Sequence, residues 1–262
     1  MGGGRMAFAD LAGTAAWGTL AAAGVFAVAG MVKGVVGLGL PTVAMALLAL
    51  WMAPAQAAAL LVVPSLLTNV WQMRPWQGVP PLWRRLAGLQ LGVCAGTWGG
   101  AWWLGAPAGE GARLALGVAL IAYALWSLAG AQGVTPPRHE RWLGPLVGVV
   151  TGTVTAATGV FVVPAVPYLQ SLGLQRDALV QAMGLSFTVS TLALAGGLIA
   201  QASLPPAVWV ASLGMLVPAL LGMAAGQWLR QRLSPPAFRR CMLASLLALG
   251  GYLVWAGRAV LL

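Results

Sequence analysis

Residues 30–41 of the chain read GMVKGVVGLGLP, which places Lys33, the one lysine of the sequence, among glycines inside a long apolar stretch. A lysine at the centre of a membrane-spanning helix costs about 2.5–3.5 kcal/mol on insertion scales, so an intramembrane cation calls for a functional explanation. The alternative is that Lys33 extends its amine along the helix to the membrane surface. This stretch therefore predicts a membrane element that carries a charged site.

The composition around this stretch indicates the class of protein. Of the 262 residues, 60% are hydrophobic and only 7% are charged, and the mean hydropathy is +0.88. Apolar segments separated by short polar loops fill the chain, with no stretch of globular composition between them. We expect an all-α polytopic membrane protein without a soluble catalytic domain. The net charge of +10 comes from arginines in the short connections, where it orients the protein in the membrane and does not indicate a nucleic-acid partner.

The order of the apolar segments indicates a duplication. Four segments are followed by four more, and the first of each set, residues 17–51 and 143–172, is the longest and is broken by glycine. Gly30-x-x-x-Gly34 in the first long segment aligns with Gly148-x-x-x-Gly152 in the second. We therefore expect a first repeat over residues 1–131, a connecting loop over 132–142 and a second repeat over 143–262.

The arginines indicate that the two repeats are inverted. The loop after the second segment of the first half carries three arginines, whereas its counterpart, residues 201–205, carries none. The next pair of loops reverses this pattern: residues 110–113 hold one arginine, and residues 230–240 hold four. If the halves are inverted, the arginine-rich loops all lie on the cytoplasmic face, with both termini outside.

The long first segment of each half predicts a hairpin. These segments contain 35 and 30 residues, too few for two full spans of about 20 residues each plus a turn. We predict a re-entrant or split hairpin with two arms of about 15 residues, followed by three transmembrane helices.

The tips of the two hairpins form the predicted anion site. Its candidate residues are Lys33, Gly34, Gly37 and Gly39 in the first tip, and Thr151, Thr155, Thr158 and Gly159 in the second. Glycine permits positive φ and close backbone approach, a restarting helix presents free N–H groups, and threonine hydroxyls donate hydrogen bonds. The alternatives are that the glycines only allow close helix packing and that the threonines bond their own helix.

A polar stripe follows the first hairpin. Ser65, Thr68, Asn69 and Gln72 are spaced i, i+3, i+4 and i+7, so they share one helix face, and Gln181 and Thr188 share a face in the other half. Asn69, Gln72 and Thr188 are added to the candidate substrate-binding residues. Hydrogen bonding between helices is an equally good explanation of the stripe.

Several function classes are disfavoured. All four acidic residues lie in termini or loops, which disfavours a cation carrier or a carboxylate-driven proton pump. Cys94 and Cys241 show no paired or metal-binding spacing, and the lone His139 lies in a charged loop. We expect no catalytic residue, no metal and no cofactor.

The glycine-rich first segment, its weaker copy at residues 148–159 and the eight-segment layout resemble the sulfite exporter TauE/SafE family of membrane permeases. The shared motifs are glycine and proline spacings, such as Gly30-x-x-x-Gly34 followed by Gly37-x-Gly39, and Ala-Pro-Ala-Gln-Ala at residues 53–57. The resemblance implies outward transport of sulfite, sulfoacetate or other organosulfonates across the inner membrane. The partners are then a small anionic substrate and membrane lipid. Uptake of another small organic anion, a non-transporting scaffold and a homodimer stay open.

Overall fold

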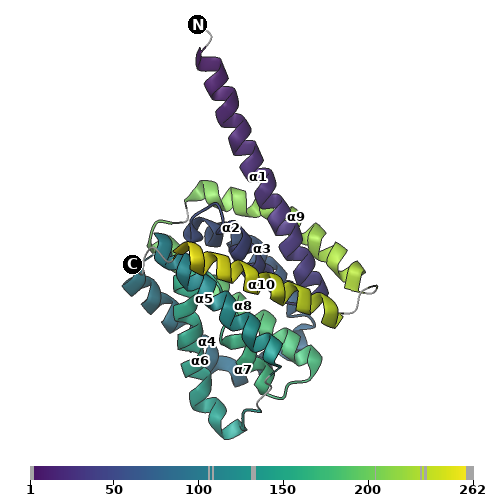
Figure 1. Ribbon diagram of the computed structural model, residues 1–262. Coiled ribbons are helices and arrows are strands. Elements are labelled where there is room, and N and C mark those ends of the chain that lie inside the picture. The colour runs from purple at the N-terminus through teal and green to yellow at the C-terminus, as the bar shows by residue number, and fades with distance from the viewer. Residues whose placement is uncertain are drawn as a thin grey trace.

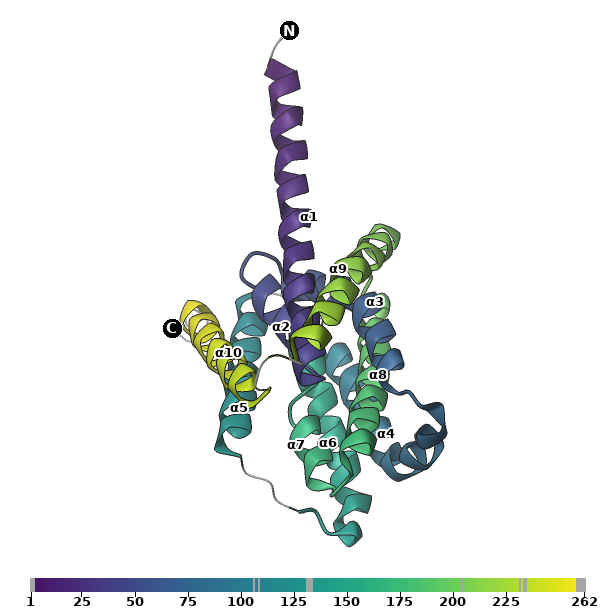
Figure 2. The same ribbon diagram turned by 90° about the vertical axis from the view of Figure 1, so that its right-hand side faces the viewer.

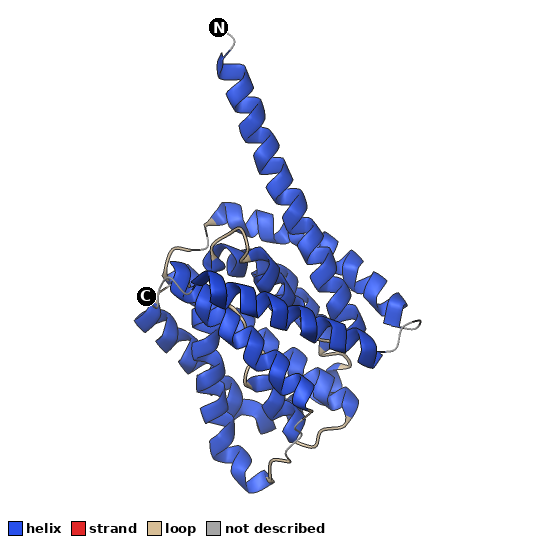
Figure 3. Cartoon of the chain, in the orientation of Figure 1, coloured by secondary structure: helices blue, strands red, loops and turns tan. Residues whose placement is uncertain are grey.

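The computed structural model describes residues 3–105, 107, 109–130, 134–203, 205–230, 232 and 235–257. Within these residues the secondary structure is helical and no strand occurs, as Figure 3 shows, so the all-α prediction is confirmed. The helices form one bundle, in which α1 lies beside α9 and α5 lies beside α10 (Figures 1 and 2).

Each half of the chain contains a long helix, a short helix and three further long helices. The first half consists of α1 (Gly3–Val36), α2 (Leu40–Leu48), α3 (Pro54–Gln72), the 3₁₀ turn η1 (Trp76–Gly78), α4 (Val79–Leu104) and α5 (Gly109–Ala129). The second half consists of α6 (Pro137–Thr158), α7 (Ala165–Ser171), α8 (Arg176–Ala200), α9 (Pro206–Arg230) and α10 (Pro235–Gly257).

Both long first segments break at predicted glycines, but the helices on the two sides of each break differ in length. Gly37 (φ 84°) and Gly39 (φ 111°) separate α1 from α2, and Gly159 (φ 71°) ends α6. These are left-handed conformations that glycine adopts without the steric cost of a Cβ. The prediction of two arms of about 15 residues is wrong, because the return helices α2 and α7 have only 9 and 7 residues. The breaks lie past the middle of each segment.

The start of the second hairpin also differs from the prediction. Helix α6 begins at Pro137, inside the segment 132–142 that was expected to be a loop, of which residues 132 and 133 lie outside the described part. Proline suits the first turn of a helix because its missing N–H would have no helical partner there. Glu140 in the same turn favours this start through the helix dipole.

Helices α1 and α9 pack in parallel through glycine. A Cβ on Gly30 would come within 2.1 Å of the carbonyl oxygen of Ala219, and one on Gly222 within 1.9 Å of that of Ala27. Gly34 and Gly226 lie one turn further along in the same arrangement, where an added Cβ would come within 2.3 Å and 2.2 Å of the opposing carbonyl oxygens. These two backbones can approach this closely only where side chains are absent.

Helices α4 and α6 repeat this packing. A Cβ on Gly148 would lie 2.3 Å from the carbonyl oxygen of Leu89, and one on Gly92 would lie 2.3 Å from that of Pro145. One turn on, a Cβ added to Gly152 or Gly96 would come within 2.3 Å or 2.1 Å of an opposing carbonyl oxygen. Gly148 and Gly152 thus hold the place in this pair that Gly30 and Gly34 hold in the other.

Two further helix pairs run antiparallel. In the α3–α8 pair, Ser65 lies against Thr191 and Gln72 lies against Val180. In the α5–α10 pair, Gly117 lies against Gly250, and Gly257 lies against Leu114. Helix α3 contacts both α8 and α9, and α8 contacts both α3 and α4, so these two helices join the glycine-packed pairs.

Candidate functional site

Lys33 lies in the last turn of α1, just before the break, and reaches into the bundle. Only 4% of its surface is exposed. Its Nζ donates hydrogen bonds to Thr68 Oγ1 at 3.1 Å and to Asn69 Oδ1. The fold therefore brings the cation of the first hairpin tip onto the polar stripe of α3, two features that are 35 residues apart in the sequence.

A chain of hydrogen bonds continues from this contact to α8. Asn69 Nδ2 donates to Ser65 Oγ at 3.1 Å, and Ser65 Oγ shares a hydrogen bond with Thr191 Oγ1 at 3.2 Å. Each of these side chains is at most 1% exposed. We call Lys33, Ser65, Thr68, Asn69 and Thr191 the Lys33 cluster; it connects α1, α3 and α8.

The acceptors of the Lys33 cluster are held by their own helix. Thr68 Oγ1 donates to the carbonyl oxygen of Pro64 at 2.7 Å, so its lone pairs are left to accept from Lys33. Asn69 is fixed in the same way, because its amide nitrogen is bound to Ser65. Both oxygens therefore face the ammonium group in a fixed geometry.

Helix α9 compensates for the proline inside α3. Pro64 has no N–H, so the carbonyl oxygen of Leu60 loses its usual partner within the helix. Ser212 Oγ of α9 donates to that carbonyl oxygen at 2.8 Å and accepts from the N–H of Val63 at 3.1 Å. The opened turn directly precedes Thr68 and Asn69, so Ser212 supports the backbone that carries the Lys33 acceptors.

The charge of Lys33 is not balanced by the described protein. The ion pairs among the described residues are Arg85–Glu140 and Arg113–Glu110, and neither includes Lys33. Both recorded acceptors are neutral, and they occupy two of the three ammonium N–H groups. A buried cation without a counterion carries a desolvation cost of several kcal/mol, which a small anion in contact with Nζ would offset.

The remaining candidates of the first half have different surroundings. Gly34 faces the backbone of α9, which is the packing role described above. A Cβ on Gly37 would meet no atom within 4 Å, whereas one on Gly39 would lie 3.2 Å from Val32. Gln72 donates to the carbonyl oxygen of Val180 at 3.2 Å, and its own Oε1 is buried without a partner among the described residues.

The threonines of the second tip mostly bond their own helix. Thr155 Oγ1 donates to the carbonyl oxygen of Thr151 at 2.7 Å, and Thr158 Oγ1 donates to that of Val154 at 2.6 Å. Thr188 does the same with Gly184 at 2.7 Å. No hydrogen bond among the described residues joins these hydroxyls to Lys33.

Thr151 and Gly159 are the two exceptions in the second half. Thr151 is fully buried, yet its Oγ1 has no hydrogen-bond partner in the described part of the chain. Gly159 lies against Met45 of α2, so the break that follows α6 touches α2.

Two members of this arrangement were not among the candidates from sequence. Thr191 follows Thr188 by three residues, so helical spacing alone could have added it to the α8 stripe. Ser212 has no such signal, because the open turn that it fills lies on another helix, 152 residues away.

Six helical segments among the described residues are long and apolar enough to cross a membrane. They are Trp17–Val36, Pro54–Gln72, Glu110–Ala129, Arg176–Ala200, Pro206–Arg230 and Arg240–Gly257. The α1 segment is thus long enough for a complete span and not only for half of one. Helix α4, expected as a span, is long enough but is not among the six. With its buried cation, the fold defines a multi-pass membrane protein.

Comparison with known protein families shows to which family of membrane proteins the chain belongs. A model described as Sulfite exporter TauE/SafE matches residues 21–253, and the chain belongs to this family. This confirms the resemblance seen in the sequence and makes the protein a member of a family of membrane transporters of sulfur-containing anions. No curated protein and no solved structure matches the chain.

Proposed function

We propose that this protein exports small sulfur-containing anions, such as sulfite, sulfoacetate or other organosulfonates, across the cytoplasmic membrane, and that Lys33 supplies the charge that binds them. The observation that carries the proposal is the burial of the Lys33 ammonium group, whose two hydrogen-bond acceptors among the described residues are both neutral. The sulfur-containing substrate class comes from the family.

The substrate would bind at the free side of the ammonium group. Thr68 and Asn69 hold Nζ from the side of α3, which leaves one N–H for an oxygen of the anion. The buried hydroxyl of Thr151 has no partner among the described residues and is our second proposed donor. Binding then needs no enzymatic step, because the anion is only desolvated and held.

Access to this site requires movement, since Lys33 is almost completely enclosed. The backbone changes direction at Gly37 and Gly39, four and six residues after Lys33, and both glycines have positive φ. We propose that the short helices α2 and α7 are the return arms of re-entrant hairpins, and that the turn at Gly37–Gly39 opens the site.

The same proposal includes two inverted repeats, residues 1–131 and 143–262. Two observations support it: α1 packs on α9 as α6 packs on α4, and the equivalent helices α3 and α8, like α5 and α10, run antiparallel. Inverted halves can exchange conformations about a site near the membrane centre, which is how many carriers alternate access.

The test of function is flux in proteoliposomes with labelled sulfite and small organosulfonates. Lys33→Met, which keeps length but removes charge, is compared with Lys33→Arg and with Arg113→Gln, which removes a charge outside the Lys33 cluster. A charged hydrogen bond is worth about 1.5–3 kcal/mol, so we expect Lys33→Met to lower flux about tenfold or more.

Two results would overturn this assignment. Normal flux in a folded Lys33→Met protein would remove Lys33 from the site. An absence of flux with every anion would favour a membrane scaffold over a transporter.

The orientation of the halves has its own test. In a background of Cys94→Ala and Cys241→Ala, single cysteines at Gln77 and Arg232 are labelled from either side of the membrane. Inverted repeats place both on the cytoplasmic face, and labelling from opposite faces would contradict the inversion.

A further inference from the structure

A polar cavity of about 370 Å³ lies between the first turns of α4 and α6. Arg84 and Arg85 line it from α4, Glu140 and Arg141 line it from α6, and Tyr168 lines it from α7. This cavity is separate from the Lys33 cluster and shares no residue with it.

The charges of this cavity are only partly paired. Arg85 donates two hydrogen bonds to the Glu140 carboxylate, at 2.9 Å and 2.7 Å, and a third to the carbonyl oxygen of Leu172 at 3.0 Å. Arg84 and Arg141 form no ion pair with a described residue. Three arginines and one glutamate leave a net charge of +2 on the cavity wall. The cavity therefore favours an anion that both unpaired guanidinium groups can reach.

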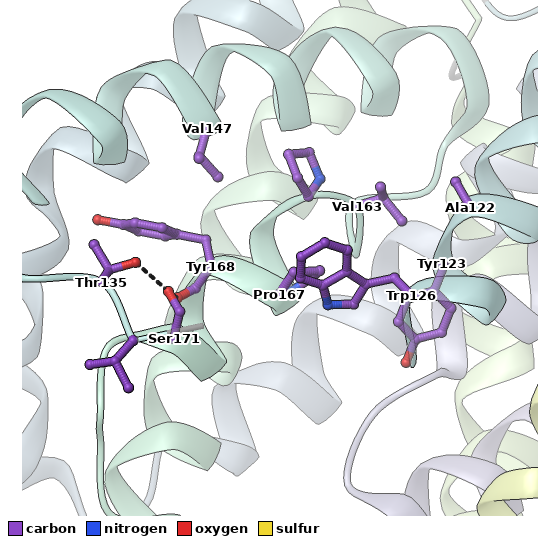
Figure 4. A pocket seen from close by; sticks show the side chains of 11 residues that line it. Ala122, Tyr123, Trp126, Thr135, Val147, Val163, Pro167, Tyr168 and Ser171 are labelled. Atoms are coloured by element: carbon purple, nitrogen blue, oxygen red, sulfur yellow. Dashed lines mark hydrogen bonds between the residues drawn. The ribbon is translucent and has the colours of Figure 1, made fainter. Parts of the chain in front are cut away.

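An apolar cavity of about 420 Å³ adjoins the polar one at Tyr168, which lines both. Figure 4 shows its two ends: Tyr168 lies beside the hydrogen-bonded pair Thr135 and Ser171, while Tyr123 and Ala122 lie at the other end. Val147 of α6 lines this second cavity, one turn beyond Gly144, which lines the first. Polar and apolar walls thus follow one another along the same helix.

The two tryptophans next to the unpaired arginines place the polar cavity at a membrane interface. Trp83 precedes Arg84 and is 48% exposed, and Trp142 follows Arg141 and is 56% exposed. Exposed tryptophans are enriched at the depth of the lipid headgroups, where the indole ring is partly in hydrocarbon and its N–H is in water. An anion at this depth is adjacent to lipid.

We propose that the two cavities together bind one anionic phospholipid, with its phosphate on Arg84 and Arg141 and an acyl chain past Tyr168 in the apolar cavity. Charge complementarity selects an anionic headgroup, and the adjoining apolar volume selects a lipid over a free anion. In the orientation proposed above, this lipid lies in the cytoplasmic leaflet. The proposal does not depend on which substrate the protein carries.

The test is lipid binding to the purified full chain in detergent, measured by native mass spectrometry with dioleoyl phosphatidylglycerol and dioleoyl phosphatidylcholine. The variant Arg84→Gln/Arg141→Gln is compared with Arg176→Gln/Arg240→Gln, which removes the same charge at exposed positions that line neither cavity. Each arginine near a lipid surface changes affinity about fivefold, so the first variant should lose about 25-fold for phosphatidylglycerol. Phosphatidylglycerol binding to the matched control should not change, and phosphatidylcholine, whose choline group offsets the phosphate charge, should bind more weakly than phosphatidylglycerol to the native protein.

The apolar part of the site has a second variant, Ala122→Phe, which fills the apolar cavity from α5. It should weaken binding of the dioleoyl lipid and leave the dihexanoyl lipid unchanged. Three results would overturn the proposal: equal binding of both headgroups, equal loss in the matched control, or inorganic phosphate alone occupying the site as tightly as the lipid. The last result would assign the cavity to a free anion.

Discussion

The α1–α9 and α4–α6 helix pairs have the same backbone packing but carry different chemistry. In both pairs, glycines one turn apart on each helix bring the chains so close that an added Cβ would lie 1.9–2.3 Å from a carbonyl oxygen. Yet three residues after the first glycine, α1 has Lys33 where α6 has Thr151. The lysine is bound to α3, and the threonine hydroxyl has no partner among the described residues.

A second difference lies at the other end of the same pairs. Arg85, seven residues before Gly92, forms an ion pair with Glu140, eight residues before Gly148, and so joins α4 to α6. The matching positions in the other pair are Met215, seven residues before Gly222 in α9, and Ala22, eight residues before Gly30 in α1. Both of these are buried. The repeated packing therefore fixes the distance between helices, and individual side chains decide where charge is placed. We infer that the two helix pairs share a packing framework but differ in the charged side chains that they carry.

The largest expected effect comes from the shared packing. Gly222→Leu and Gly92→Leu each force a side chain into an opposing backbone, which cannot move aside as a flexible side chain would. We expect each to destabilise the fold by about 3 kcal/mol or more, seen as lower melting temperature and aggregation on gel filtration. Gly214→Leu and Gly99→Leu are the controls, because a Cβ at these positions meets no atom within 4 Å. If only one of the two packed glycines proves essential, the pairs are not equivalent.

Asn69→Leu tests the hydrogen bond that Lys33 of the α1–α9 pair donates to α3. Among the described residues, the substitution leaves Lys33 with Thr68 as its single acceptor, and losing a hydrogen bond to a buried charge costs about 1.5–3 kcal/mol. Thermal unfolding in detergent should show this loss. Because an apolar pair leaves no unpaired charge, Asn69→Leu with Lys33→Met should recover stability but not flux. Failure of the double variant to recover would mean that Asn69 acts through Ser65 and not through Lys33.

Thr151→Val tests whether the second pair contributes to the anion site. The hydroxyl makes no hydrogen bond to a described residue, so its removal should change stability by no more than about 0.5 kcal/mol. If Thr151 donates to the bound anion, KM for flux should rise about fivefold, since a neutral hydrogen bond contributes about 1 kcal/mol. An unchanged KM would restrict the site to the first pair.

The smallest effect is expected at the Arg85–Glu140 ion pair, which joins α4 to α6 and has no counterpart in the α1–α9 pair. The hydrogen bond from Arg85 lowers the pKa of Glu140 below its usual range. A depressed carboxyl pKa adds stability above the ordinary pKa, and that stability is lost as pH falls through the folded-state value. The Arg85 side chain is 38% exposed, so solvent screening limits the contribution to less than about 1 kcal/mol.

Melting temperatures between pH 7 and pH 3 measure this contribution. The native protein should lose slightly more stability over the acidic range than Glu140→Gln, which cannot titrate. Identical pH profiles would show that the ion pair adds nothing measurable.

Local rules of sequence account for much of the fold. Apolar periodicity and composition predicted the helices, and positive φ at Gly37, Gly39 and Gly159 follows from the freedom of glycine. The spacing of Gly30 and Gly34, matched by Gly148 and Gly152, recurs in the two packed pairs. The predicted arm lengths and the loop at 132–142 were wrong, because the position of a break and the first turn at Pro137 depend on single residues within long apolar segments.

By itself, the sequence determined that this is an all-helical membrane protein of the TauE/SafE family. It also showed a lysine within an apolar segment beside a glycine break, and a polar stripe on the next long helix. Only the tertiary structure decided that Lys33 bonds Thr68 and Asn69, that Gly34 packs on α9, and that Ser212 fills the turn opened by Pro64. Periodicity shows which residues share a face of one helix. Which faces meet depends on how the helices cross, and that is set by close packing among residues far apart in the chain.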